Sequence, residues 1–242
     1  MKVEVYLIAW NEMDTIHLTI KHYKQFCDKV ILYDNFSTDR TREIAKGLGA
    51  EVRLFGEKGQ LSDKWYLKIK NNCWKESEAD WVIVCDADEI LYAPMIYDKI
   101  YEAKERGETI FVTYGWNVFS NDMPCETFLE IQTGFFDKNY SKTVIFNPKE
   151  IKEINFGYGC HESQPRGNVV WSRDTLTLFH YRNIGGSERL VERHRVYRKR
   201  LSALNKELKL GVHYNYPDER RRLEWAQQYE KSVEYSQGGL KF

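Results

Sequence analysis

The sequence lacks several signatures that would assign it to a common class of protein. Its five cysteines are odd in number and no two are spaced as CxxC, which argues against a disulfide framework or a zinc ribbon and favours a reducing compartment. No window reaches the roughly 18 apolar residues of a membrane span, and the chain enters an apolar strand at Val3 without an extended signal core. We therefore expect a soluble, cytoplasmic protein without a transmembrane segment.

The charge balance also argues against a partner selected by bulk charge. Lysine plus arginine and aspartate plus glutamate both total 36, so the formal net charge is zero and nothing global indicates nucleic acid or an anionic membrane. Basic residues do gather in residues 193–200 and 220–222, and we interpret both runs as solvated helix faces. No repeat, low-complexity tract or linker divides the 242 residues, so we expect one large domain.

The first half of the sequence alternates between strand and helix patterns. Short apolar runs rich in β-branched residues predict strands, and apolar residues that recur every three or four positions between them predict helices. This alternation is typical of an α/β protein with a mostly parallel sheet and helices on both faces. The predicted strands are residues 3–9, 30–33, 51–55, 81–85 and 109–114, and the predicted helices lie within residues 16–26, 38–47, 63–73 and 95–106.

Beyond Tyr114 the pattern changes to short β segments with irregular connections, which predicts a mixed sheet. We expect β structure in residues 127–136, 142–146 and 175–181. The C-terminal part is expected to be helical. Ser187 would cap a long helix whose apolar face runs from Leu190 to Leu208, and a last helix would run from Pro217 to about Ser236.

Two of the predicted parallel strands end in acidic residues. Strand 81–85 runs directly into Asp86, Asp88 and Glu89, and strand 30–33 runs into Asp34. Ligands of open α/β sheets bind beyond the carboxyl ends of the strands, so we expect these carboxylates to face one crevice. A nucleotide lying there would meet Asp34 with its base or ribose, and its diphosphate would meet a divalent cation held by Asp86 or Asp88. The alternative for Asp34 is a turn or capping residue.

Three stretches resemble signatures of the family-2-like glycosyltransferases of the GT-A fold, in the order of that family. They are Asn11-Glu12 after the first strand, residues 33–39 (YDNFSTD), and residues 80–89 (DWVIVCDADE), which contain the DxD pattern of that family. The resemblance covers residues 2–92 and continues more loosely to Tyr181. It implies a Rossmann-like fold for nucleotide-diphospho-sugar transferases, and transfer of a sugar from a nucleotide-sugar donor.

The resemblance also implies which residues bind the donor. The nucleoside pocket would be lined from the ends of the first two strands, and Asp86 would lie by the ribose and the metal. A cation is expected at the diphosphate, where Lys142, Lys64 and Lys68 compete, although each alone could be a solvated lysine. The expected donor-binding residues are Ala9, Glu12, Asp34, Asn35, Lys64, Asp86 and Lys142.

The metal site implied by the resemblance has Asp88 as its principal ligand, with Glu89 in its surroundings or on the acceptor side. Metal-dependent enzymes of this fold often add a histidine from the second half of the domain, and the candidates here are His161 and His180. A histidine beside carboxylates favours Mn²⁺, with Mg²⁺ as the alternative. The other interpretation of each histidine is a hydrogen-bonded structural residue. The expected metal ligands are Asp86, Asp88, His161 and His180.

The second half of the sequence is expected to bind the acceptor. Family-2-like enzymes mostly invert the anomeric centre, which needs a carboxylate base within about 3 Å of the acceptor hydroxyl. The candidate bases are Asp122, Glu126 and Glu162. Four aromatic residues would offer platforms to a sugar, or else belong to the core: Trp116, Phe119, Tyr158 and Trp171.

The sequence therefore predicts one glycosyltransferase domain over residues 1–242, with a nucleotide-binding half (1–115), an acceptor and metal half (116–185) and C-terminal helices (186–242). The donor would be a UDP- or GDP-sugar, and the acceptor a glycan, lipid-linked or protein hydroxyl in glycan or glycoconjugate synthesis. One alternative is a nucleotidyltransferase that forms a nucleotide-sugar, but residues 9–13 (AWNEM) lack its usual glycine-rich loop. The other alternative is a non-catalytic nucleotide-binding module.

Overall fold

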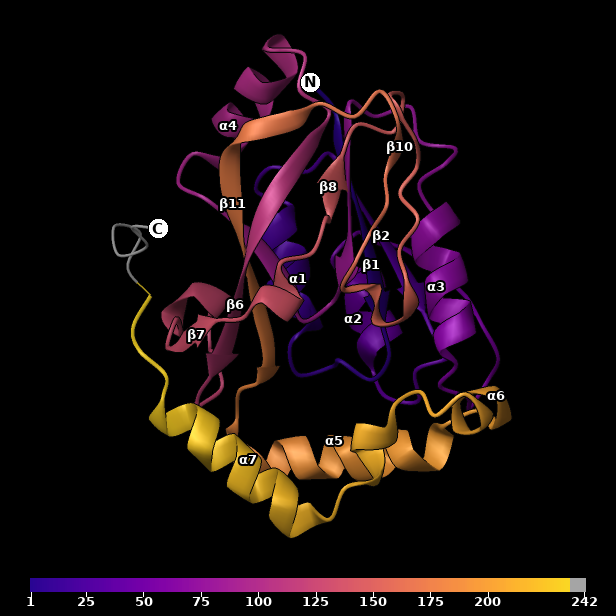
Figure 1. Ribbon diagram of the computed structural model, residues 1–242, viewed down its shortest axis with the longest axis vertical. Coiled ribbons are helices and arrows are strands. Elements are labelled where there is room, and N and C mark those ends of the chain that lie inside the picture. Colours follow the sequence, from indigo (N-terminus) through magenta and orange to yellow (C-terminus); the bar gives the residue numbers. More distant parts are fainter. Residues whose placement is uncertain (236–242) are drawn as a thin grey trace.

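The computed structural model describes residues 1–235, and within them a curved nine-stranded mixed sheet forms the centre (Figure 1). The strand order is β3-β2-β1-β4-β8-β6-β11-β5, with β7 paired to β6. The strands are β1 (Val3–Ala9), β2 (Lys29–Asp34), β3 (Glu51–Leu54), β4 (Trp81–Asp86), β5 (Glu89–Tyr92), β6 (Ile110–Phe119), β7 (Gly134–Phe136), β8 (Ile145–Phe146) and β11 (Trp171–Asn183). Strands β9 (Ile151–Glu153) and β10 (Arg166–Gly167) form a separate pair.

Helices cover both faces of this sheet. Alternate residues of β1 belong to different apolar cores: Val5 packs in the core that includes Ile20 of the first helix, whereas Ile8 packs in the core that Ile69 of the third helix covers. The predicted α/β class is therefore confirmed. The helices are α1 (Ile16–Tyr23), α2 (Thr41–Gly47), α3 (Asp63–Asn72), α4 (Ile96–Glu105), α5 (Gly186–Arg200), α6 (Ala203–Glu207) and α7 (Asp218–Glu230), with 3-10 turns η1 (Phe128–Glu130), η2 (Lys138–Tyr140), η3 (Tyr158–Cys160) and η4 (Val212–Asn215).

The register of the parallel strands brings the acid-terminated ends together. Strands β2 and β4 flank β1 in parallel, with Asp34 opposite Ala9 and Asp86 opposite Ile8. The two strands thus end within one residue of each other along β1, which confirms that their carboxyl ends share an edge of the sheet. The second half adds antiparallel pairs of β8 with β4 and of β5 with β11, as the prediction of a mixed sheet requires.

The predicted helix from Ser187 to Leu208 is wrong in its extent. Helix α5 ends at Arg200 because Leu201 and Ser202 are extended, and Leu201 forms a β-bridge with Leu61 instead. The side chain of Ser202 then caps the separate helix α6 by accepting from the backbone N–H of Asn205. Helix α7 ends at Glu230, short of the predicted end at Ser236, which lies outside the described residues.

Residues 127–131 are also not the strand that was predicted. They form the turn η1, in which Thr127 and Glu130 make a capping box that satisfies the backbone N–H groups locally. Strand β7 begins only at Gly134.

Helix α5 lies across the sheet at the end where the arrows of β6 and β11 point (Figure 1). The backbone N–H of Leu61 donates to the carbonyl of Arg200 at 2.7 Å, which ties the end of α5 to the loop before α3. Helix α5 therefore lies over the edge of the sheet at which the acid-terminated strands end. Across the part of the chain described here, no helix combines the length and apolar character that a bilayer crossing requires.

Gly115 in β6 fixes the loop that carries Tyr140 and Lys142, and its replacement by alanine tests that role. A Cβ atom at this position would meet backbone atoms of Tyr140 at 2.3 Å and of Ser141 at 2.5 Å. Because backbone cannot rotate away, we expect Gly115→Ala to lower the free energy of unfolding by about 1–3 kcal/mol. The control is Gly47→Ala, where nothing lies within 4 Å. Equal stability of the two variants in urea denaturation would contradict this expectation.

Candidate active site

The acidic segment forms the turn between β4 and β5. Asp86 ends β4, Ala87 and Asp88 make the turn, and Glu89 begins β5. The backbone of Ala87 is held on both sides, since its N–H donates to the carbonyl of Ile8 at 2.9 Å and its carbonyl accepts from the Thr19 hydroxyl at 2.7 Å. This fixed turn presents Asp86 and Asp88 to a cavity of about 250 Å³.

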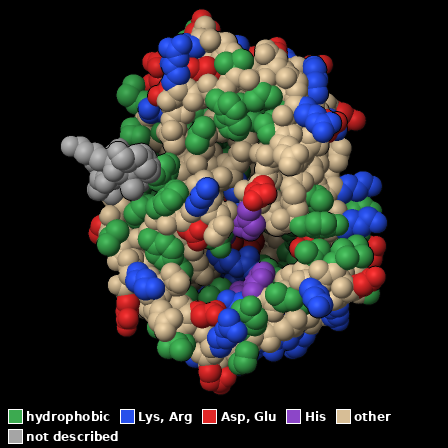
Figure 2. All heavy atoms as spheres, viewed as in Figure 1, with side chains coloured by type: hydrophobic (Ala, Val, Ile, Leu, Met, Phe, Trp, Pro, Cys, Tyr) green, Lys and Arg blue, Asp and Glu red, His purple; other side chains and the backbone are tan. Residues whose placement is uncertain are grey.

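The cavity lies between the carboxyl ends of the strands and the C-terminal segment, and charged side chains line it. Figure 2 shows histidine, basic and acidic side chains gathered in the hollow at the middle of this face. The lining carboxylates are Glu12, Asp63, Asp86 and Asp88, and the lining cations are Lys70, Lys142, Arg182 and Arg193. The lining also includes three histidines and five aromatic residues. They are His161, His180 and His213, and Trp10, Tyr66, Tyr140, Tyr197 and Tyr214.

Two buried lysines neutralise the acidic turn. Lys70 of α3 lies 2.8 Å from Asp86, and Lys142 lies 3.6 Å from Asp86 and also pairs with Glu89. Burial alone would raise the pKa of Asp86, but the two ammonium groups outweigh it and hold that pKa well below its usual range. Glu89 is fully buried, and its other oxygen accepts from the backbone N–H of Asp86 at 2.9 Å. The carboxylate of Glu89 therefore positions Asp86 rather than facing the cavity.

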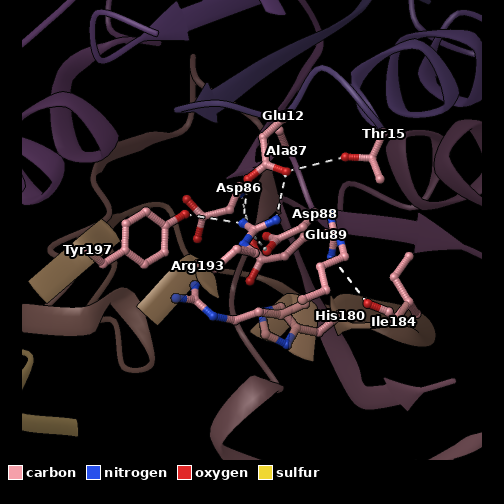
Figure 3. Close-up of polar contacts among 12 residues, drawn as sticks. Glu12, Thr15, Asp86, Ala87, Asp88, Glu89, His180, Ile184, Arg193 and Tyr197 are labelled. Carbon is pink, nitrogen blue, oxygen red and sulfur yellow. Dashed lines mark hydrogen bonds and ion pairs between the residues drawn. The ribbon is translucent and has the colours of Figure 1, made fainter. Parts of the chain in front are cut away.

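Arg193 joins helix α5 to the acidic turn. Its guanidinium donates two hydrogen bonds to Glu12, at 2.6 and 3.1 Å, and a third to the Tyr197 hydroxyl at 3.2 Å. It also lies 3.9 Å from Asp88, and Figure 3 shows Glu12, Asp88 and Arg193 converging. The interpretation of this basic run as a solvated helix face is therefore wrong for Arg193, and for Arg200, which is buried over the ring of Trp10.

His180 carries a lone pair suited to a metal. Its Nδ1 lies 3.3 Å from the Asn117 side-chain oxygen, which also accepts from Asn183, so we assign the His180 proton to Nδ1. Burial lowers the pKa of His180 to about 4, which keeps the ring neutral. Nε2 is then an acceptor, and no side chain of residues 1–235 donates to it. Asp88 is close enough for its charge to act on this ring.

His161 has a similar arrangement on the other side of Tyr140. Its Nδ1 lies 2.6 Å from the carbonyl of Asn139, which leaves Nε2 as the acceptor. The ring of Tyr140 contacts both histidines, stacking on His180 at 4.2 Å and meeting His161 edge-on at 5.7 Å. Within the described residues, no three histidine, cysteine, aspartate or glutamate side chains gather closely enough to hold a metal alone.

Comparison with known proteins assigns the chain to a family. The profile described as Glycosyl transferase family 2 matches residues 4–146, more than half of the 242 residues. The chain belongs to glycosyl transferase family 2. This match contains the acidic turn, Glu12, Lys70 and Lys142, whereas Arg193 and both histidines lie beyond it.

Curated relatives of this family 2 chain match little more than a third of it. An uncharacterized glycosyltransferase of Rickettsia prowazekii (strain Madrid E) is 37% identical over 92 residues, which cover 37% of this chain and 29% of that protein. A second, from Rickettsia typhi (strain ATCC VR-144 / Wilmington), has the same identity and coverage. The matched part is therefore less than a third of the length of these relatives.

Solved structures match the chain at lower sequence identity. S. aureus TarS has a TM-score of 0.48 and 16% identity, over 81% of this chain and 39% of that chain. Glucosyl-3-phosphoglycerate synthase from Mycobacterium tuberculosis, in complex with Mn²⁺, UDP and glucosyl-3-phosphoglycerate, has a TM-score of 0.33 and 22% identity, over 47% of this chain and 44% of that chain.

The expected donor-binding residues of this family 2 chain separate into two groups. Ala9, Glu12, Asp86 and Lys142 line the cavity, but Asp34, Asn35 and Lys64 do not. Asp34 is fully buried, and it accepts hydrogen bonds from the backbone N–H and the hydroxyl of Ser37, at 2.7 and 2.5 Å. This is the geometry of a turn residue, which was the alternative to nucleotide binding for Asp34. The side-chain oxygen of Asn35 accepts from Arg200 at 2.6 Å.

The expected acceptor-side residues do not line the cavity either. The three candidate bases, Asp122, Glu126 and Glu162, are exposed and lie outside the lining. Among the described carboxylates that do line it, only Asp63 has no cation within 4 Å, and it accepts from the Asn205 side chain at 3.0 Å. Of the expected platforms, Trp116 and Phe119 are buried in the cores, and Tyr158 and Trp171 are about half exposed elsewhere.

Sequence reasoning missed Lys70, Arg182 and Arg193. Asp63, Tyr66 and Lys70 all line the cavity and are spaced three and four residues apart, so they form one face of α3. In α5, Arg193 and Tyr197 share a face in the same way. Helical spacing groups these residues on one face of each helix, but it does not indicate that this face is the one turned to the cavity.

Proposed function

We propose that this chain transfers a glycosyl group from a nucleotide-sugar donor, UDP- or GDP-linked, to an acceptor hydroxyl by direct displacement with inversion, in glycan or glycoconjugate synthesis. The observation that carries the proposal is the acidic turn of a family 2 chain opening into a cavity that is also lined by three cations, Lys70, Lys142 and Arg193. A donor diphosphate is the ligand that such a combination of carboxylates and cations suits.

Asp88 and His180 are the residues that would hold a divalent cation, Mn²⁺ or Mg²⁺, together with diphosphate oxygens. A carboxylate and a neutral imidazole suit Mn²⁺, and the hydrogen bond from His180 Nδ1 to Asn117 fixes the tautomer that such a ligand needs. The bound cation would act as a Lewis acid that stabilises the departing diphosphate. Asp86 is already neutralised by Lys70 and Lys142, so we propose that it accepts hydrogen bonds from the donor instead.

Three cations of the cavity would bind and orient the donor. Lys142 and Lys70 lie on the β4 side of the cavity, and Arg193 lies 3.9 Å from Asp88. Each already has a carboxylate partner, so a donor diphosphate would share these cations rather than meet free charges. The ring of Trp10 faces the same cavity and offers a surface for the nucleoside. The acceptor, whether glycan, lipid-linked or protein, would enter from the side of His161 and His213.

Nucleotide-sugars with Mn²⁺ should stabilise the protein against heat. A ligand that binds only the native state raises the free energy of unfolding by about 2.7 kcal/mol at a hundred times its Kd. Because each 1 kcal/mol shifts the Tm by about 2–4 °C for a chain of this size, the expected shift is about 5–11 °C. We expect such a shift for UDP- or GDP-sugars, and we expect excess EDTA to remove it. A thermal-shift screen of UDP-, GDP- and dTDP-sugars with Mn²⁺ measures this.

Slow hydrolysis of the stabilising donor separates glycosyl transfer from its alternatives. We expect release of free sugar that depends on Mn²⁺ or Mg²⁺. A nucleotidyltransferase would instead require a nucleoside triphosphate and release pyrophosphate, and a binding module would release no sugar at all. Binding of a donor without any turnover, with or without metal, would refute the proposed activity.

A further inference from the structure

Arg182 is a cavity arginine without an acidic partner. It lies near the end of β11, two residues after His180, so both side chains leave the strand on the same face and both line the cavity. Its guanidinium donates to the Tyr214 hydroxyl at 3.1 Å and lies over the rings of Tyr197 and Tyr214, at 5.1 and 5.7 Å. The two rings hold the guanidinium in place without neutralising it.

The other cations that line the cavity are all paired. Lys70 lies 2.8 Å from Asp86, Lys142 pairs with Glu89, and Arg193 lies 2.6 Å from Glu12. In residues 1–235, by contrast, no carboxylate lies within 4 Å of the Arg182 guanidinium. A cation withdrawn from water without a counter-charge is costly unless a ligand supplies that charge. Arg182 is therefore the lining cation that is free to receive an anion.

The charge of Asp88 acts on Arg182 from beyond 4 Å, and the side chains beside Arg182 are neutral or basic. His213 and Tyr214 of η4 line the cavity beside it, and burial together with the charges of Arg182 and Arg221 lowers the pKa of His213 to about 4. His194 of α5 lies against His213 and Tyr214, with ring centroids 5.8 and 5.1 Å away. Of the carboxylates near this end, Glu224 is already paired with Arg221 at 2.9 Å.

We propose that Arg182, with His213 and the Tyr214 hydroxyl, forms a subsite for an oxyanion carried by the acceptor, a phosphate or a carboxylate. The flat fork of the guanidinium suits either oxyanion, because both offer two oxygens in one plane. This inference rests on the proposed glycosyl transfer and adds to it the chemical class of the acceptor.

The position of the subsite favours the acceptor over the donor. The acidic turn and its two lysines belong to residues 4–146, the part that matches the family profile. Arg182, His213 and Tyr214 lie beyond that part, on β11 and η4. The three cations assigned to the donor lie against Asp86 or Asp88, so Arg182 is the lining cation left for a group of the acceptor.

The test is titration of inorganic phosphate into the protein already saturated with UDP or GDP, whichever binds, and Mg²⁺, so that the donor subsite is filled. Acetate is titrated in parallel to distinguish a carboxylate from a phosphate. We expect one of the two anions to bind, as followed by calorimetry and by the NMR signals of the histidine rings. Its Kd should rise at least tenfold in Arg182→Gln and less in Arg182→Lys, while nucleotide affinity stays unchanged.

Arg195→Gln is the matched control, because Arg195 is on the exposed side of α5 and pairs with Asp218 at 2.7 Å. It removes the same charge and should leave anion binding as in the wild type. Absence of binding by both anions, equal binding in Arg182→Gln, or an equal loss of nucleotide and anion affinity in Arg182→Gln would overturn the proposal. Failure of the proposed function would give a different result. The wild type would then bind no nucleotide, but the free protein would still bind the anion through Arg182.

Discussion

Asp88→Asn is expected to abolish metal-dependent nucleotide binding and to leave the fold intact. Asparagine has nearly the same size, but it lacks the charge that a divalent cation requires from its principal ligand. Loss of residues that only support a metal ligand typically costs about 10–100-fold in metal affinity, so removal of the ligand itself should cost at least roughly 100-fold. Calorimetry with UDP or GDP, with and without Mn²⁺, measures the effect.

The fold should tolerate this substitution because no cation is left without a partner. Arg193 keeps its two hydrogen bonds to Glu12, and the carbonyl of residue 88 still accepts from the backbone N–H of Tyr181 at 2.8 Å. The matched control is Asp63→Asn, which removes a carboxylate from the same cavity, away from the proposed metal. Unchanged nucleotide affinity in Asp88→Asn, with Mn²⁺ present, would refute the role proposed for Asp88.

The sheet and its acid-terminated edge were predictable because their pattern is local. Residues 81–85 are continuously apolar, as a strand covered on both faces must be, and the acids follow where the strand leaves the core. Parallel pairing then forces Asp34 and Asp86 to one edge, whatever the details of the helices. The two residues nevertheless have different surroundings, since the Ser37 hydroxyl satisfies Asp34 within its own turn.

The lysine of the site was not predictable from composition. Helix α3 carries Lys64, Lys68 and Lys70, and only the direction in which the helix packs distinguishes them. Lys68 lies over the ring of Trp65 at 5.0 Å on another face, whereas Lys70 is buried against Asp86. A buried lysine is stable here because Asp86 supplies its counter-charge, and the sequence does not reveal that pairing.

The prediction that the arginines of α5 face water was wrong for Arg193 and Arg200 for a similar reason. An arginine-rich helix is expected to face water, but the partners of Arg193 and Arg200 are Glu12 and Asn35, 181 and 165 residues away in sequence. Contacts of such separation leave no local pattern. The early end of α5 is also caused by a contact between residues distant in sequence. Leu201 forms a β-bridge with Leu61, and this pairing replaces a further turn of helix. The division into residues 1–115, 116–185 and 186–242 stays a prediction.

Lys142→Met is expected to destabilise the protein by about 3–5 kcal/mol, the usual cost of removing one partner from a buried ion pair. Lys142 is 5% exposed and Glu89 is fully buried, so the variant leaves the Glu89 carboxylate without its counter-charge. Lys70 does not replace it, since it is already paired with Asp86. The free energy of unfolding in urea measures the loss, and Lys75→Met, which breaks an exposed pair with Glu153, should cost less than about 1 kcal/mol.

The double variant Lys142→Met/Glu89→Gln decides whether the lost charge pair is the cause. Glutamine has no charge to leave uncompensated, and its side-chain oxygen can still accept from the backbone N–H of Asp86, as Glu89 does at 2.9 Å. We therefore expect the double variant to recover more than half of the stability lost in Lys142→Met. If the two substitutions simply add, the buried pair is not what stabilises the acidic turn, and packing of the Lys142 side chain against its neighbours is the cause instead.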